Sequence, residues 1–347
     1  MKNRKLLTVL SFISAVSILM TGCGSFHKPT EMPDTGDSKK AAKAEIILRA
    51  GETNPATHIM SRVWYRFADI VNEKSEGRIY VEVYPAGQLG DERTQLQTLQ
   101  MGALDFFRVS TYTAGDFGAE KFNLFSLPYL FTGREHLWKV VNSQIGSDLL
   151  KDIDDNVDGM VGLSYLEEGA RNFFTTKKAA VEPEDLKGMK IRIAESSILM
   201  DTIRCFGANP TPISYSELFT SLQTGVVDGA DQPLSGYYSN SFNEVSPYMV
   251  MDGHTYGLSV MVMSKRTFEK LSEEDRQLIM DAALEASQYN KEVAQQEDDE
   301  IMKKLEEANT PVIQPRDITK WQEMVQPVYE KYGKEYTDLI DEIKAMQ

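Results

Sequence analysis

The sequence predicts an α/β protein built from two lobes. Short apolar strands alternate with amphipathic helical segments along nearly all of the chain, a pattern typical of α/β folds. The length of 347 residues exceeds that of one ordinary hydrophobic core and favours two domains. A helical pattern over residues 272–308 is far longer than the average helix of about 11 residues. The apolar share of 41% and the charged share of 26% are those of a soluble globular protein.

The N-terminal segment is predicted to be a targeting signal rather than part of the fold. A positively charged start precedes an apolar run over residues 6–20, as in secretory signals. The run leads into Gly22 and Cys23, an ending similar to the bacterial lipobox, although Met20 stands where that pattern prefers Leu, Ala or Val. We expect a signal peptide over residues 1–22 and lipidation at Cys23, which anchors the protein on the extracytoplasmic face of the cell membrane. An uncleaved anchor or ordinary secretion is the alternative.

The mature chain is expected to be strongly acidic and to start with a tether. Residues 23–43 are rich in Pro, Gly, Ser and charges without periodicity, which predicts a flexible linker. Removing residues 1–22 leaves 34 basic against 52 acidic residues, a formal charge of −18. This charge argues against nucleic acid as a partner, and an anionic ligand would need a local cationic pocket. Apart from Cys23 only Cys205 remains, so no disulfide framework is expected, and Cys205 is predicted to be a small core residue.

The alternation of strands and helices is read from apolar periodicity. The strand predicted over residues 104–110 carries Arg108 in its interior, and interior cations are expected to come with partners. Outside the central stretch, strands are predicted over residues 45–50, 78–84, 104–110, 160–166, 247–251, 256–264 and 310–313. Helices are predicted over residues 59–74, from the 85–93 loop to residue 99, over about 135–152, over 272–308 and in a tail over 321–346.

The central stretch, residues 190–234, carries the residue on which the functional argument depends. Arg192 lies between apolar neighbours in a predicted strand, where an unpaired cation is costly. Its planar guanidinium can pair with a carboxylate through two parallel hydrogen bonds, which a lysine cannot do. From the residues alone, a ligand and an internal acid both remain open as its partner. Around it we expect a strand over 189–193, a helix over 196–206, an extended passage at Pro210 and Pro212, a helix over 217–223 opened by a capping box at Ser214 and Glu217, and a strand over 226–232.

Catalytic and metal-binding patterns are missing from the sequence. There is no nucleophile elbow, zinc-protease motif, phosphate loop or dinucleotide fingerprint, and the four histidines have no metal-ligand spacing. Residues 154–159 mimic the start of a calcium loop, but Tyr165 replaces the glutamate required at the twelfth position. Glu167 and Glu168 are adjacent on a strand and should point to opposite faces, which counts against a glycosidase pair. We therefore expect no enzyme activity and no cofactor.

Several ordered motifs resemble the substrate-binding proteins of tripartite ATP-independent periplasmic (TRAP) transporters, the DctP family. They are Lys-Gly-Met-Lys-Ile-Arg at 187–192, Gly-Ala-Asn-Pro-Thr-Pro at 207–212, Ser-Glu-Leu-Phe at 216–219 and Leu-Gln-Thr-Gly-Val-Val-Asp-Gly at 222–229. The resemblance implies a two-lobed, periplasmic-binding-protein-like clamshell with discontinuous domains and a long helix bridging the lobes. It places residues 44–168 and about 256–297 in lobe I, and residues 169–255 and about 298–347 in lobe II.

The resemblance also implies the candidate ligand site. In that family the arginine that matches Arg192 binds the ligand carboxylate, and a Gly-x-Arg segment matching Arg171 also lies on the ligand. Gln232 stands where many members have Asn, and Asp231 resembles their usual acidic neighbour. The remaining candidate ligand-binding residues are Arg108, Tyr215, Glu92, Asn54 and His58.

The favoured function is capture of an organic acid between the lobes and its delivery to TRAP membrane permease subunits. A hexuronate such as glucuronate or galacturonate is the first choice of ligand, and a C4-dicarboxylate or another carboxylate is the second. A solute-binding protein of an ATP-driven importer would share the signal and the clamshell, but not the full set of motifs. An extracellular enzyme acting on sugar acids would need a positioned acid/base pair.

Overall fold

The structure is a computed structural model that describes residue 41 and residues 43–347. The predicted signal peptide over residues 1–22, the predicted lipidation site Cys23 and nearly all of the predicted tether over residues 23–43 lie outside the described residues. Within the described part of the chain, no helix is long and apolar enough to cross a membrane.

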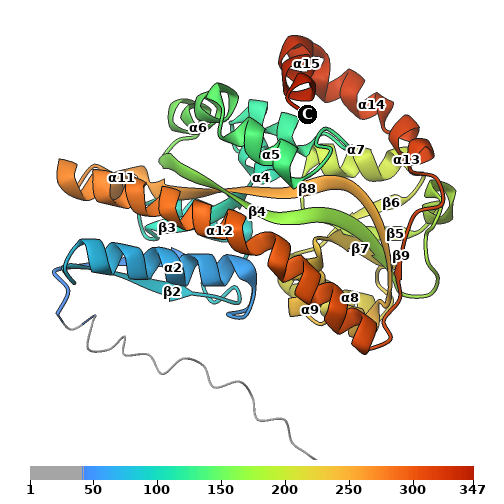
Figure 1. The fold of residues 1–347 in the computed structure, drawn as a ribbon, viewed down its shortest axis with the longest axis horizontal. Helices are drawn as coiled ribbons and strands as arrows, with labels where there is room; N and C mark the ends of the chain where they lie inside the picture. The colour runs from blue at the N-terminus through green and yellow to red at the C-terminus, as the bar shows by residue number, and fades with distance from the viewer. Residues whose placement is uncertain (1–40, 42) are drawn as a thin grey trace, which may run out of the picture.

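One mixed sheet runs through the described molecule. Its strands are β1 (Ile46–Gly51), β2 (Ile79–Tyr84), β3 (Phe106–Ser110), β4 (Met160–Thr175), β5 (Lys190–Ile193), β6 (Asn209–Pro212), β7 (Gly229–Gln232), β8 (Tyr248–Ser264) and β9 (Val312–Ile313). Their order is β2-β1-β3-β8-β4-β7-β5-β6, with β9 paired to β8. Strands β1, β2 and β3 pair in parallel at one end, and β7, β5 and β6 pair in parallel at the other. The long antiparallel strands β4 and β8 lie between these ends and join them (Figure 1).

Helices cover both faces and both ends of the sheet. They are α2 (Ile59–Lys74), α3 (Glu92–Gln100), α4 (Thr111–Asp116), α5 (Arg134–Val141), α6 (Gln144–Asn156), α7 (Ser197–Cys205), α8 (Leu218–Gln223), α9 (Leu234–Ser239), α10 (Phe242–Val245), α11 (Lys265–Phe268), α12 (Glu273–Glu307), α13 (Ile318–Met324), α14 (Gln326–Val328) and α15 (Thr337–Ala345). Short 3-10 turns are η1 (Glu120–Ser126), η2 (Pro183–Leu186), η3 (Tyr215–Glu217) and η5 (Lys334–Tyr336), and η4 (Tyr329–Gly333) is a single π turn.

The two long strands differ from the prediction, which ended β4 too early and divided β8 into two strands. The predicted strand over residues 160–166 continues to Thr175, and the strands predicted over 247–251 and 256–264 are one strand, β8. Gly169 and Gly253 adopt left-handed backbone conformations with φ of 98° and 56°. The β4–β8 register shifts between Glu167 and Ala170, so the glycines bend the strands without ending their pairing.

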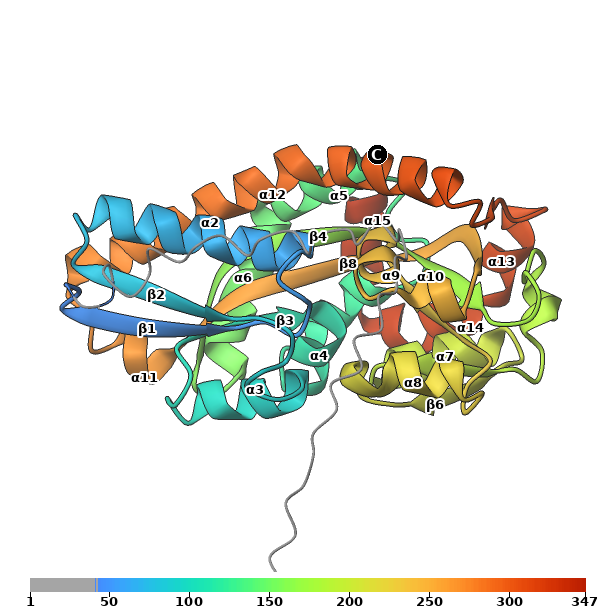
Figure 2. The same cartoon turned by 90° about the horizontal axis from the view of Figure 1, so that it is seen from below.

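The long helix bridges the two lobes, as predicted. It runs for 35 residues and begins at Ser272, whose hydroxyl accepts a hydrogen bond from the backbone N–H of Asp275. Its first half packs on α2 and its last turns bury Ile301 and Leu305 in a separate core beside α8 and α9. Figure 2 shows the helix extending along the whole molecule over both ends of the sheet.

The bridging helix is fixed to β4 where the lobes meet. Asn290 accepts a hydrogen bond from the backbone N–H of Glu167 at 2.8 Å and donates one to its carbonyl at 3.1 Å. The Glu167 carboxylate pairs with Arg134, which also binds Asp298 of α12 at 2.7 Å. This side chain therefore points to the α12 side of the sheet.

The C-terminal helices pack against a core that contains residues of both lobes. Trp321 is fully buried, with its ring 5.8 Å from Phe173 and 5.2 Å from Phe206. Further along, His136 of α5 hydrogen-bonds to the Ile343 carbonyl at 2.7 Å. The predicted helical tail over residues 321–346 is thus made of short pieces that follow the curved surface of this core.

Two local predictions need correction. The capping box expected at Ser214 and Glu217 does not form, because the Ser214 hydroxyl donates to the Glu217 carboxylate at 2.7 Å instead of capping the backbone. Residues Tyr215–Glu217 form a 3-10 turn, and α8 starts at Leu218. Cys205 is only half-buried, and it packs on the edge of the shared core rather than inside it.

Candidate ligand-binding cleft

A groove of about 350 Å³ lies between the lobes. One wall comes from the loops that follow β1 and β2, and the opposite wall comes from segments around η3, α8 and α10. Residues distant in the sequence therefore face one another across the groove. Its lining residues are Thr53, Pro55, Ala86, Gly87, Gly90, Asp91, Tyr215, Ser216, Phe219, Asn240 and Phe242.

Arg192 is a buried cation without an acidic partner. It occupies the third position of β5 and is 3% exposed. Its Nε donates to the Ile213 carbonyl at 2.8 Å, and its guanidinium carbon lies 5.5 Å from the centre of the Tyr215 ring. Among the described residues, no carboxylate forms an ion pair with it. Burial lowers the pKa of Arg192 and outweighs the opposite effects of Tyr112, Asp231 and Tyr215.

Arg171 differs from Arg192 because its charge is compensated. Its Nε binds Asp231 Oδ2 at 2.6 Å and its Nη2 donates to the Asp231 carbonyl at 2.9 Å. Strand β7 pairs with β4 beside this arginine, which brings residues 60 positions apart into contact. The guanidinium carbon lies 6.0 Å from the centre of the Tyr112 ring of α4. A cation of β4 therefore lies over an aromatic ring of α4.

A histidine extends this ion pair into the core. His254 Nε2 lies 3.3 Å from Asp231, and its Nδ1 lies 2.7 Å from Asp252. Burial opposes protonation, but the two aspartates outweigh it and raise the pKa of His254 to about 9. Burial likewise works against ionisation of Asp231, yet Arg171 and His254 hold its pKa well below the usual range. Asp231 therefore stays a carboxylate between two cations.

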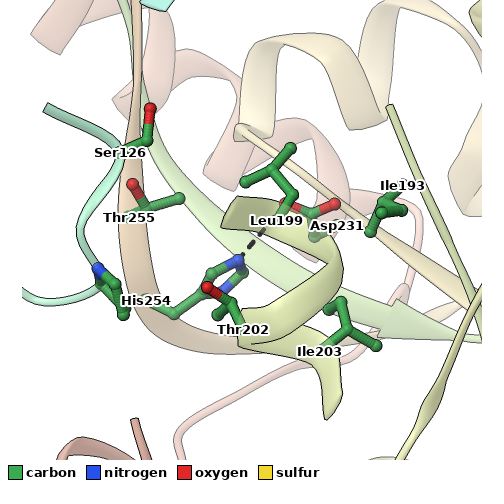
Figure 3. A pocket seen from close by; sticks show the side chains of 9 residues that line it. Ser126, Ile193, Leu199, Thr202, Ile203, Asp231, His254 and Thr255 are labelled. Carbon is green, nitrogen blue, oxygen red and sulfur yellow. Dashed lines mark hydrogen bonds and ion pairs between the residues drawn. The ribbon is translucent and has the colours of Figure 1, made fainter. Parts of the chain in front are cut away.

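Asp231, His254 and Thr255 line part of a very small cavity of about 10 Å³ (Figure 3). The dashed line in the figure joins His254 and Asp231. Leu199 and Thr202 of α7 and Ser126 of η1 enclose the space from other directions. A volume of this size holds about one water molecule, so an organic acid cannot bind there.

Arg108 is held by two carboxylates. Its Nε and Nη2 each lie 3.0 Å from Glu52, and its Nη1 lies 2.7 Å from Glu168. Asn54 donates to the same Glu52 oxygen through its backbone N–H and its side-chain amide, both at 2.9 Å. Burial would favour the neutral acid, but Arg108 dominates the outcome and lowers the pKa of Glu52 to about 2. The partners expected for this interior arginine are thus found within the chain.

Glu168 points to the opposite side of β4 from Glu167, as predicted for adjacent strand residues. Glu167 pairs with Arg134 towards α12, while Glu168 pairs with Arg108 in the cleft. Burial raises the pKa of Glu168, partly offset by Arg108. The two carboxylates cannot act together on one substrate, because the sheet separates them.

Two other predicted site residues, His58 and Glu92, form hydrogen bonds within the chain. His58 is 1% exposed and caps α2 by accepting from the Met60 N–H at 3.1 Å; burial is the main cause that lowers its pKa to about 3. His58 therefore lies in the support behind Glu52 rather than in the groove. Glu92 begins α3 and accepts from the backbone and hydroxyl of Ser110, at 2.8 and 2.6 Å.

The remaining predicted residues lie in η3 and β7. The Tyr215 hydroxyl accepts from Asn240 at 2.9 Å, and both residues line the groove. Burial raises the pKa of Tyr215, and Glu168, Arg192, Arg171 and Arg108 all act on it electrostatically. Gln232 is buried at the end of β7, next in sequence to Asp231.

Tyr215 lines the groove, and Arg192, Arg171 and Arg108 act on it electrostatically, whereas His58 caps α2 and Asn54 binds Glu52 outside the groove lining. Sequence reasoning missed Glu52, Glu168, Tyr112 and Asn240. The position of Glu168 just before the Gly169–Arg171 segment was a usable signal, since the strand pattern already gave its face. Nothing in the sequence indicated that Glu52 would meet an arginine 56 residues away.

The chain is similar to proteins of known class. The family model described as bacterial extracellular solute-binding protein, family 7, matches residues 50–335. A TRAP periplasmic solute-binding protein from Xanthobacter autotrophicus Py2, solved with bound β-D-galacturonate, is 30% identical, with a TM-score of 0.82 over 86% of this chain and 100% of that chain. One from Pseudomonas putida F1, solved with bound D-glucuronate, is 28% identical, with a TM-score of 0.84 over 87% of this chain and 97% of that chain. The C4-dicarboxylate-binding protein DctB of Bacillus subtilis strain 168 is 31% identical over 272 residues, which cover 77% of this chain and 76% of that protein.

Proposed function

This chain belongs to the bacterial extracellular solute-binding proteins of family 7, and on that basis we propose that it captures a hexuronate, such as glucuronate or galacturonate, between its two lobes. The chain is a solute-binding protein of the TRAP type and not an enzyme. Membership in this family also favours a secondary transporter over an ATP-driven importer as its partner.

The observation that carries the proposal is the uncompensated charge of Arg192. A buried ion without a partner costs several kcal/mol after relaxation of its surroundings. A buried arginine that hydrogen-bonds to one carbonyl and has no acidic ion-pair partner among the described residues is explained if an anion completes the site. A ligand carboxylate can accept two parallel hydrogen bonds from such a guanidinium, and Arg171 lies near enough to influence the charge of Arg192.

The charge pattern favours a monocarboxylate over a C4-dicarboxylate. Among the described cleft residues, Arg171 and Arg108 are already paired with acids, which leaves one arginine free for a ligand carboxylate. A dicarboxylate would need a second uncompensated cation. Two solved relatives hold uronates, which supports the same choice, whereas the Bacillus subtilis relative keeps the C4-dicarboxylate alternative in view.

The cellular setting follows from the same premise. The protein acts outside the cytoplasm and delivers its ligand to a TRAP membrane permease, while lipid anchoring at Cys23 is part of the proposal. Residues 44–168 with about 256–297, and 169–255 with about 298–347, are proposed to act as the two lobes that close around the ligand. The proposed ligand-binding set is Arg192, Arg171, Gln232, Arg108, Tyr215, Glu92 and Asp231, with Asn54 and His58 supporting it from behind.

A thermal-shift screen of the purified protein against organic acids tests the proposal. A ligand present at a hundred times its Kd stabilises the folded state by about 2.7 kcal/mol, which raises the melting temperature measurably. We expect D-glucuronate or D-galacturonate to raise it and succinate or malate to leave it unchanged. A rise with succinate or malate alone would assign the protein to dicarboxylates instead, and titration calorimetry then gives the affinities.

A further inference from the structure

We propose that Glu168 is the specificity-determining residue that selects sugar monoacids, by accepting hydrogen bonds from ligand hydroxyls and repelling a second carboxylate. This inference rests on the proposed function, because it concerns the part of the cleft away from the carboxylate clamp at Arg192.

Glu168 is positioned to face a ligand. It lies on β4 where the two lobes join, with its side chain 10% exposed on the cleft side of the sheet. Ser235 at the start of α9 donates to its carbonyl at 3.2 Å, so lobe II holds its backbone in place. Its Oε1 binds Arg108, while Oε2 has no hydrogen-bond partner among the described residues. Since Oε2 is not among the fully buried unpartnered atoms of the described chain, it keeps some exposure to solvent.

The charges around Glu168 give this end of the cleft an acidic character. Glu52 already satisfies Arg108 through two hydrogen bonds, so Glu168 is a second carboxylate on the same guanidinium. Arg192, by contrast, has no acid of its own. The cleft is therefore cationic at Arg192 and anionic at Glu168, a polarity that orients a ligand with one carboxylate and several hydroxyl groups.

A free carboxylate oxygen treats two kinds of ligand in opposite ways. A sugar hydroxyl can donate to it and form a hydrogen bond with a charged acceptor, which is stronger than one between neutral groups. A second ligand carboxylate can only accept hydrogen bonds, so it cannot bond to Glu168. It also carries the same charge as Glu168, and the repulsion between the two lowers the affinity for such a ligand. The same side chain thus attracts a polyol end and rejects an acidic end.

The surroundings of Glu168 act on its pKa in both directions. Burial raises its pKa, and Glu52 and Glu92 add to the effect, while Arg108 and Arg171 oppose it. The surroundings therefore already resist negative charge at this point. A dianionic ligand would add another negative charge to the same place.

Titration calorimetry on Glu168→Gln tests the inference with D-galacturonate and with the pair galactonate and galactarate. The last two differ by one group, a terminal CH₂OH in galactonate and a second carboxylate in galactarate. We expect the glutamine variant to bind galacturonate about 10- to 100-fold more weakly, because a charged acceptor is lost. Its affinity for galactarate relative to galactonate, measured by displacement of galacturonate, should rise by about tenfold or more.

Two further variants distinguish a change in ligand specificity from a loss of folding or of overall affinity. Glu168→Asp keeps the charge, so it should still reject galactarate even if its affinity for galacturonate falls. Glu184→Gln removes an exposed carboxylate on η2, away from the cleft, and should leave every affinity unchanged. Thermal melting of each variant without ligand reports any loss of folding.

The outcomes distinguish this inference from the function on which it rests. An unchanged galactarate-to-galactonate ratio in a folded Glu168→Gln protein would overturn the role of Glu168, while galacturonate binding by the wild type would leave the proposed function in place. A wild-type protein that binds galactarate more tightly than both monoacids would overturn both.

Discussion

Replacing Arg192 by lysine separates the charge of this residue from its geometry. Lysine keeps the positive charge but cannot donate to the Ile213 carbonyl and offer two parallel hydrogen bonds to a carboxylate at the same time. Hydrogen bonds to charged groups contribute about 1.5–3 kcal/mol each, so the affinity for a uronate should fall by about one to two orders of magnitude. Titration calorimetry with wild type and Arg192→Lys measures this loss directly.

Replacing Arg192 by alanine should weaken binding further and leave unliganded stability nearly unchanged. No carboxylate among the described residues pairs with Arg192, so its removal leaves no acid uncompensated. Arg171→Ala is the matched control, because it leaves Asp231 buried with one cation fewer. Breaking a buried ion pair from one side costs about 3–5 kcal/mol, which should appear as a lower melting temperature in this control alone.

Two results would refute the reasoning about Arg192. Wild-type affinity in Arg192→Ala would show that the ligand carboxylate is bound elsewhere. A melting temperature that collapses in Arg192→Ala without ligand, as far as in Arg171→Ala, would show that Arg192 has a structural role like that of an internal ion pair.

Three other predictions concern stability, motion and anchoring. Because the pKa of His254 is raised from 6.5 to about 9, its contribution to the free energy of unfolding is complete below about pH 6.5 and is lost as the pH rises through 9. Denaturant melts should therefore show stability falling by up to about 3 kcal/mol between these pH values, and His254→Asn should flatten that slope. The radius of gyration from small-angle scattering should decrease when ligand saturates the protein, and an unchanged radius would indicate a rigid pocket. Intact mass of membrane-extracted protein should give an acylated chain beginning at Cys23; a free form starting at another residue would end the lipoprotein prediction.

Local sequence patterns determined most of the elements because the forces that set them act over a few residues. The helix predicted over residues 59–74 is found at Ile59–Lys74, where its apolar face is buried against β1 and β2. The long helix predicted over residues 272–308 is found at Glu273–Glu307, because Ser272 caps its first turn. Arg192 was also placed correctly in a strand, since a single cation between apolar neighbours keeps the strand period.

The prediction of a capping box at Ser214 was wrong because the local pattern allows two arrangements. The Ser-x-x-Glu spacing is compatible both with backbone capping and with a hydrogen bond between the two side chains, and the structure adopts the second. The predicted strand ends at residues 166 and 251 were also wrong, because pairing between β4 and β8 continues through the bends at Gly169 and Gly253.

Only the tertiary structure decided which arginine is free. Arg108 and Arg192 lie in predicted strands and Arg171 follows one, and no local rule tells which of the three is paired within the chain. Arg108 meets Glu52 and Arg171 meets Asp231 across 56 and 60 residues of chain, because sheet order brings β1 beside β3 and β7 beside β4. Charge compensation depends on distances in space, so all three arginines remained candidates from the sequence, whereas the fold pairs two of them with acids and leaves Arg192 without an acidic partner among the described residues.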